Sequence, residues 1–187
     1  MQSSPFTITA PALGVPGHSE TEELGSITWL WMHTPGHRDL PLHALIKLVL
    51  PALKTQQFIL ASALDGDTTR PVADLAWANF SAGAESRYLQ NAAALRPEDW
   101  NSGDRIWITD WFTPFGHSTE FRKTIEILLP HSCSRALYHH GNERGLRVMT
   151  FRGQNVSPVH AKTWWQARPM LAQPTTHSIE YRLLEIL

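Results

Sequence analysis

Two separate parts of the chain carry side chains suited to general acid–base chemistry. His37 follows a sharp turn, because Thr34-Pro35-Gly36 places a proline next to a glycine. Asp110 lies in the apolar run IWITDWF, where an unpaired carboxylate is costly to bury. A carboxylate can orient an imidazole and stabilise its protonated form, which makes the imidazole an effective base. We therefore take His37 and Asp110 as the candidate catalytic residues.

Each of these residues also has a purely structural interpretation. Asp110 can pair with Arg105 or with a backbone donor, or it can lie on the solvent face of an edge strand. His37 can be a turn histidine that packs on Trp29 or Trp31. The residue pattern alone leaves these alternatives open.

Other kinds of catalytic site have weaker support in the sequence. His33 and His37 are four residues apart, but the proline and glycine between them disfavour a helical metal pair, and no HExxH motif follows. His139-His140 is more typical of a surface pair at a strand end. Cys133 has no activating neighbours, and no G-x-S-x-G motif is present. We expect no metal site.

The composition limits the classes of function. The chain has 187 residues, a net charge of −1 and 18% charged residues, so it lacks the basic footprint of a nucleic-acid-binding protein. One cysteine excludes an internal disulfide and fits a reducing compartment. No apolar run approaches the ~18 residues of a transmembrane segment, and the N-terminus does not resemble a signal peptide. We expect a cytoplasmic protein.

The length is typical of one domain. Residues 1–22 are rich in Pro, Ser, Thr and Gly, so we expect a flexible N-terminal arm followed by a single domain over residues 23–187. Helices are predicted within 24–33, starting after Gly25 or Ser26, and within 40–55, where Pro51 should kink or end the helix.

The middle of the chain has the pattern of a hairpin and a central strand. The runs at 57–64 and 71–80 flank the turn-forming DGDTTRP and predict two paired strands. A helix is predicted within 81–95 and a central strand at 105–112.

The second half repeats this alternation of helices and strands. A helix capped by Ser118 or Thr119 should end at Pro130, and two strands should flank a turn at Gly141-Asn142. A last helix can begin at Pro158. The order predicts an α/β (α+β) fold with a mixed, antiparallel-rich central sheet flanked by helices. A strand, a loop and a helix start also carry the donor in GNAT-like acyltransferases, although the loop TPFGHST lacks the glycine-rich cradle typical of coenzyme A enzymes.

Several motifs resemble one known family. GSITWLWMHTPGHRDLP, AWANFS, EDWNSGDRIWITDWFTPFG and the FRG after Thr150 resemble the RTX toxin-activating lysine acyltransferases, in register over roughly residues 24 to 165. The resemblance implies a GNAT-like fold and transfer of a fatty acyl group from acyl carrier protein to internal lysines of an inactive RTX protoxin. It also places the catalytic histidine on His37 and the essential aspartate on Asp110.

The resemblance suggests further roles and partners. The Thr34 hydroxyl is a candidate substrate-binding or oxyanion-stabilising group, and Arg122 and Lys123 are candidates for docking the acidic carrier protein. Acyl-acyl carrier protein is expected as co-substrate, with no other cofactor. A homodimer is expected, and a nucleic-acid partner is not.

Two other functions stay open at this point. The chain could be a coenzyme A-dependent GNAT-like N-acyltransferase that acts on another amine. It could also be a non-catalytic relative that binds acyl carrier protein or protoxin, since Lys47 stands where a member of the family carries asparagine.

The chemistry implied by the resemblance needs a base. Lysine, with a pKa of about 10.4, is almost wholly protonated at pH 7, and freeing its amine costs about 4.6 kcal/mol. His37, polarised by Asp110, can take that proton as the amine attacks the thioester. A covalent acyl-histidine is the alternative route.

Overall fold

The chain builds one mixed sheet with helices on both faces. A computed structural model describes residues 5–138 and 147–174. Within these ranges six strands form a single sheet in which each strand pairs with the next one along the chain. The strands are β1 (Thr7–Thr9), β2 (Phe58–Asp65), β3 (Thr68–Phe80), β4 (Arg105–Phe112), β5 (Cys133–Tyr138) and β6 (Arg147–Arg152).

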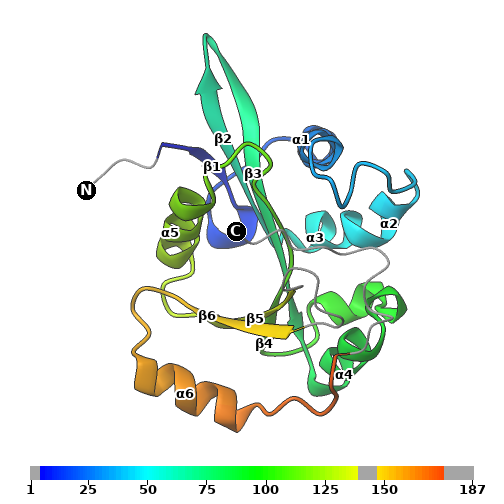
Figure 1. The fold of residues 1–187 in the computed structure, drawn as a ribbon, viewed down its shortest axis with the longest axis vertical. Coiled ribbons are helices and arrows are strands. Elements are labelled where there is room, and N and C mark those ends of the chain that lie inside the picture. The colour runs from blue at the N-terminus through cyan, green and yellow to red at the C-terminus, as the bar shows by residue number, and fades with distance from the viewer. Residues whose placement is uncertain (1–4, 139–146, 175–187) are drawn as a thin grey trace.

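The helices lie on both sides of the sheet, which Figure 1 shows nearly edge-on. One side carries α5, whereas α1, α2 and α3 cover the other side at one end and α4 covers it further along. The α-helices of the described residues are α1 (Glu20–Met32), α2 (Ala44–Leu48), α3 (Leu50–Thr55), α4 (Ala82–Gln90), α5 (Ser118–Leu128) and α6 (Pro158–Ala167).

Strand pairing is antiparallel except between β4 and β5. These two strands are parallel, and α5 makes the crossover that parallel neighbours require. β2 and β3 form the predicted hairpin, with Gly66 at φ 62° in a two-residue turn. The prediction of a mixed, antiparallel-rich sheet with flanking helices is confirmed.

The two faces of the sheet bury different apolar clusters. On the α5 side, Trp111, Phe121 and Ile125 pack with Ile108 and Val72. On the side of α1, α2 and α3, the apolar residues of these helices close over Phe112 and Leu60. Because side chains alternate along a strand, neighbouring residues of β4 serve opposite cores.

The N-terminal half departs from the prediction in two places. Part of the expected flexible arm is ordered, because Thr7–Thr9 add strand β1 to the edge of β2 and bury Phe6 and Ala10. Helix α1 begins at Glu20 and not after Gly25, because Ser19 caps it in a capping box with Glu22.

The prediction for Pro51 is confirmed, since the 40–55 segment divides into α2 and α3 with Pro51 in the first turn of α3. The predicted cap of α5 is wrong. His117, at φ 70°, takes the N-cap position and makes no side-chain cap. The Gly141-Asn142 turn and His139-His140 lie outside the described residues.

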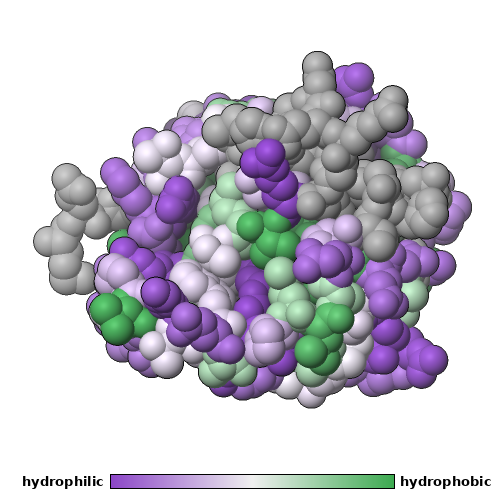
Figure 2. Space-filling view, turned by 60° about the horizontal axis from the view of Figure 1, so that its bottom comes forward, coloured by the Kyte–Doolittle hydropathy of each residue, from purple (hydrophilic) through white to green (hydrophobic). Residues whose placement is uncertain are grey.

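The surface is mixed in character. In the view that brings the lower end of Figure 1 forward, hydrophobic side chains gather near the centre of the face among hydrophilic ones (Figure 2). Across the described residues, none of the helices combines the length and the apolarity that crossing a bilayer demands.

Candidate functional site

A tight turn after α1 fixes the position of His37. The Thr34 carbonyl accepts the backbone N–H of His37 at 2.9 Å and that of Arg38 at 3.0 Å. The Thr34 hydroxyl donates to the Leu30 carbonyl at 2.9 Å, which ties the turn to the end of α1. The proline and glycine of this turn end the helix, and the hydrogen bonds on Thr34 then direct His37 back toward the sheet.

The His37 imidazole is enclosed by aromatic rings. Its centroid lies 4.8 Å from that of Trp31 and 4.6 Å from that of Phe112, and the residue is 1% exposed. His37 is therefore buried beneath the turn. The structural interpretation of His37 allowed packing on Trp29 or Trp31, and the contact found is with Trp31.

A β-bulge sets the direction of Asp110. In the β3–β4 ladder Ala76 pairs with Asp110, and Trp77 pairs with Ile108, so Thr109 is an extra residue in β4. The bulge leaves Asp110 on the same face as Phe112, which packs under α1. Asp110 is 3% exposed.

The fold brings His37 and Asp110 together although they are far apart in the sequence. His37 Nε2 lies 4.0 Å from Asp110 Oδ1. This distance fits an ion pair when the imidazole is protonated, and catalytic hydrogen bonds are often this long before substrate binds. The alternative partner of Asp110, Arg105, instead donates to Glu85 Oε2. Both predicted catalytic residues thus occupy one apolar pocket.

A second acidic residue on this face was missed by the sequence analysis. Asp74 of β3 pairs in register with Phe112, and it is 1% exposed. Burial, and then the nearby charge of Asp110, raise the pKa of the Asp74 carboxyl well above its usual value. The signal in the sequence was the same as for Asp110, namely an aspartate within an apolar strand.

The three predicted substrate-binding residues do not meet at one place. Thr34 is 2% exposed, and its hydroxyl is occupied by the bond to Leu30, whereas its carbonyl accepts the His37 N–H. Arg122 and Lys123 lie on the exposed surface of α5, where Arg122 donates to Glu126 at 3.1 Å. Lys47 is exposed on α2.

The residues weighed for metal or thiol chemistry take structural positions. His33 Nδ1 lies 2.8 Å from the Trp29 carbonyl, and the His33 ring lies 5.0 Å from that of Phe115. The described residues hold no group of three or more His, Cys, Asp or Glu suited to a metal ion. Cys133 is buried, and burial raises the pKa of its thiol, which makes it a poor nucleophile.

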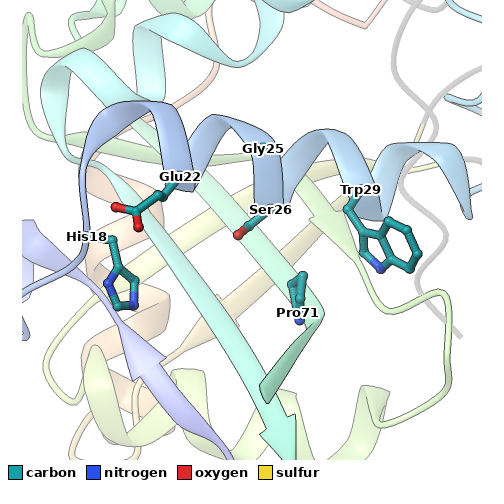
Figure 3. Close-up of a pocket in the computed structure, with 6 residues that line it drawn as sticks. All are labelled: His18, Glu22, Gly25, Ser26, Trp29 and Pro71. Atoms are coloured by element: carbon teal, nitrogen blue, oxygen red, sulfur yellow. The ribbon is translucent and has the colours of Figure 1, made fainter. Parts of the chain in front are cut away.

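The surface also carries cavities outside this pocket. One of about 430 Å³ lies between α1 and β3, where Glu22, Ser26 and Trp29 run along the helix and face Pro71 (Figure 3). Another of about 280 Å³ lies between α5 and β6. Neither is lined by His37 or Asp110, so neither is the site of their chemistry.

Comparisons with known proteins agree with the motifs. A model of the RTX toxin acyltransferase family matches residues 17–152. A leukotoxin-activating lysine-acyltransferase, LktC, of a Pasteurella haemolytica-like species (strain 5943B) is 37% identical over 139 residues, covering 74% of this chain and 82% of the relative. The RTX-II toxin-activating lysine-acyltransferase ApxIIC of Actinobacillus pleuropneumoniae is 35% identical over 145 residues, covering 76% and 88%. The protein-lysine myristoyltransferase RtxC of Kingella kingae is 37% identical over 134 residues, covering 72% and 78%.

Proposed function

Because the chain belongs to the RTX toxin acyltransferase family, we propose that it transfers a fatty acyl group from acyl carrier protein to internal lysine side chains of an RTX protoxin. The proposal joins the reaction named for the relatives to the buried histidine–aspartate couple of this chain.

One observation carries the proposal. His37 Nε2 lies 4.0 Å from Asp110 Oδ1, with both side chains nearly inaccessible to solvent. In poorly solvated surroundings a carboxylate favours the imidazolium form of its neighbour and so strengthens it as a base. This is the property that a protein-lysine acyltransferase needs, since its acceptor arrives as an ammonium ion.

The proposed reaction uses His37 as the general base. With Nε2 directed at Asp110, Nδ1 is the ring nitrogen that takes a proton from the attacking lysine. The amine adds to the thioester carbonyl, the C–S bond breaks, and the imidazolium returns its proton to the departing thiolate. The ammonium loses two protons overall, one to the thiol and one to solvent. An acyl-histidine would instead accumulate when acyl donor is added without protoxin.

The carrier protein is proposed to dock near the N-terminal half of α5. Charge reversal of Arg122 or Lys123 should raise the apparent KM for acyl-acyl carrier protein and change its salt dependence, because acidic carriers meet basic patches. Lys162→Glu, on the exposed surface of α6, is the matched control. A KM that responds equally to all three substitutions would argue against this docking site.

Mass spectrometry tests the proposed reaction. The purified chain is incubated with an RTX protoxin and either acyl-acyl carrier protein or the matching acyl-coenzyme A. We expect acylated internal lysines with the carrier-protein donor. Equal turnover of the free coenzyme A thioester would favour the coenzyme A-dependent alternative, and binding without acylation would favour the non-catalytic one.

The proposal also covers the cellular compartment and the oligomeric state. We place the reaction in the cytoplasm, which the single cysteine supports. We also propose a homodimer, which is supported by the exposed apolar side chains of Met32, Leu42 and Ile46 on or beside α1 and α2. Sedimentation at micromolar concentration tests the assembly, and a monomer at every concentration would contradict it.

A further inference from the structure

A second carboxyl group faces the same pocket as the histidine–aspartate couple. In the β3–β4 ladder Asp74 pairs with Phe112 and Ala76 pairs with Asp110. Paired residues share a face of the sheet, as do residues two apart along a strand. Asp74 and Asp110 are therefore diagonal cross-strand neighbours, a relation in which side chains lie within about 7–8 Å.

The surroundings of Asp74 are mostly apolar. Leu60 pairs with it from β2, and the apolar residues of α1, α2 and α3 cover this face. Asp74 Oδ1 is buried and has no hydrogen-bond partner within the described residues. The backbone N–H of Leu75 bonds to the carboxyl, and Asp110 is the charged group whose field acts on it most strongly.

The other charged groups of the adjoining elements face elsewhere. Glu23 of α1 lies against Gly17, and Lys54 of α3 pairs with Glu20 at the surface. Arg70 of β3 pairs with Asp65 near the hairpin turn, and its guanidinium lies 4.8 Å from the Phe115 ring centroid. Lys47 of α2 is exposed. Asp110 and His37 are thus the titratable groups of this pocket on which Asp74 can act.

Packing alone does not explain an acid at this position. A carboxyl group in apolar surroundings weakens a fold, and an apolar side chain would satisfy the same cluster. Costly polar groups of this kind gather at functional sites. The position of Asp74 beside the couple indicates what it acts on.

We propose that Asp74 is a positioning residue of the acyl-transfer site. Its carboxyl controls the protonation of His37 by adding or withholding a second negative charge beside Asp110. The kinetic consequence of this inference depends on the proposed function. Asp74 itself touches neither substrate nor donor in this account.

The direction of the effect follows from charge. While Asp74 is protonated it adds no charge beside His37, and Asp110 is the acidic group within ion-pair distance of the imidazole. When Asp74 loses its proton, at a pH above the ordinary aspartate range, a second buried anion appears. It favours the imidazolium over the neutral imidazole and opposes the oxyanion of the tetrahedral intermediate. Ionisation of Asp74 should therefore lower kcat/KM as the pH rises through the raised pKa of its carboxyl.

The test compares the wild type with Asp74→Asn, which keeps the shape of the neutral carboxyl and cannot ionise. The His37 ring signals are followed by NMR against pH and assigned with His37→Gln. In the wild type we expect two steps, because a second buried charge on the same face of the sheet changes the His37 protonation equilibrium about tenfold. Asp74→Asn should show one step, and Asp67→Asn, in the turn of the same hairpin, should match the wild type.

Kinetics supply the second readout. Asp74→Asn should keep its kcat/KM constant over the pH range in which the wild-type value falls about tenfold as Asp74 ionises. A one-step His37 titration in the wild type, or the same fall of kcat/KM in Asp74→Asn, would overturn the inference.

The wild-type titration still tests the inference if Asp74→Asn fails to fold, because a one-step titration would overturn it. It also needs no protoxin. A chain that acylates no lysine but shows the two-step titration would refute the proposed function and leave the carboxyl coupling in place.

Discussion

Two carboxyl groups on one face of the sheet give the pocket of His37 its electrostatic character. Asp110 lies within ion-pair distance of the imidazole, and Asp74 lies one diagonal step from Asp110. Both are nearly fully buried, so water screens their charges poorly. At the residue scale, the chemistry of the site is set by which of these two groups carries a proton.

Asp74→Asn should stabilise the protein at neutral pH. The folded-state pKa of Asp74 is raised above its unfolded value, so the folded chain keeps a proton that the unfolded chain has lost. Stability therefore falls as pH rises from the unfolded pKa, near 3.9, through the folded one. The substitution removes this loss, and thermal melts from pH 4 to pH 8 should show a gain that grows with pH. A constant difference across this range would show that folding does not raise the pKa of Asp74.

Single residues were predictable where a polar side chain interrupts an apolar pattern. An aspartate within an apolar strand predicts Asp110, and the sharp turn predicts His37; the structure brings the two together. Asp74 lies in a similar pattern, but only the cross-strand register shows that it shares a face with Asp110. The Thr34 hydroxyl could not be assigned from sequence, since its bond to Leu30 depends on how α1 ends.

Interactions at its two ends fix the position of helix α1 beside the pocket. α1 begins with the Ser19–Glu22 capping box, in which the Ser19 hydroxyl accepts the Glu22 N–H and the Glu22 carboxylate accepts the Ser19 N–H. The last turn of α1 then carries Trp31 to the imidazole and leads into the Thr34 turn. A substitution that weakens the start of α1 should therefore affect the site mainly by lowering the stability of the fold.

Ser19→Ala should destabilise the fold by about 1 kcal/mol, the usual loss for an N-cap hydroxyl. Urea denaturation measures the change. Thr21→Ala, in the same exposed first turn but without a cap role, is the matched control and should change stability little. Equal effects of the two substitutions would show that the cap does not hold α1.

Elements were predictable by type, and their boundaries less so. The hairpin and the strand Arg105–Phe112 followed from composition and period, because tertiary contacts reinforce those local preferences. The start of α1 was placed too late, because its first turn is polar and only the Ser19-x-x-Glu22 pattern marks it. β1 carries no local signal, since three residues become a strand only through pairing with β2.

At the scale of the whole molecule, a buried ionic network joins distant parts of the chain. Glu85 of α4 is fully buried and accepts from Arg105 of β4, Arg135 of β5 and the Trp107 indole. Arg135 also donates to the Arg168 carbonyl, beyond α6. The segment after α6 is thus attached to the sheet next to the strand that carries Asp110.

Glu85→Ala should be severely destabilising, by about 3–5 kcal/mol, because it leaves buried arginines without their shared carboxylate. Chemical denaturation measures the loss, with the exposed Glu120→Ala on α5 as control. A loss no larger than that of the control would mean that the network contributes nothing to holding the sheet and the α6 segment together.

The central claim is that His37 and Asp110 act as one unit in lysine acylation. It is tested most directly by the single-turnover rate of protoxin lysine acylation in His37→Ala, Asp110→Asn and the double variant, all checked for wild-type circular dichroism. Removing a general base should cost about 10²–10⁴-fold, and the double variant should be little slower than His37→Ala, because groups that act together are non-additive. Losses that multiply fully, or a His37→Ala enzyme that keeps more than about a tenth of the wild-type rate, would contradict the account.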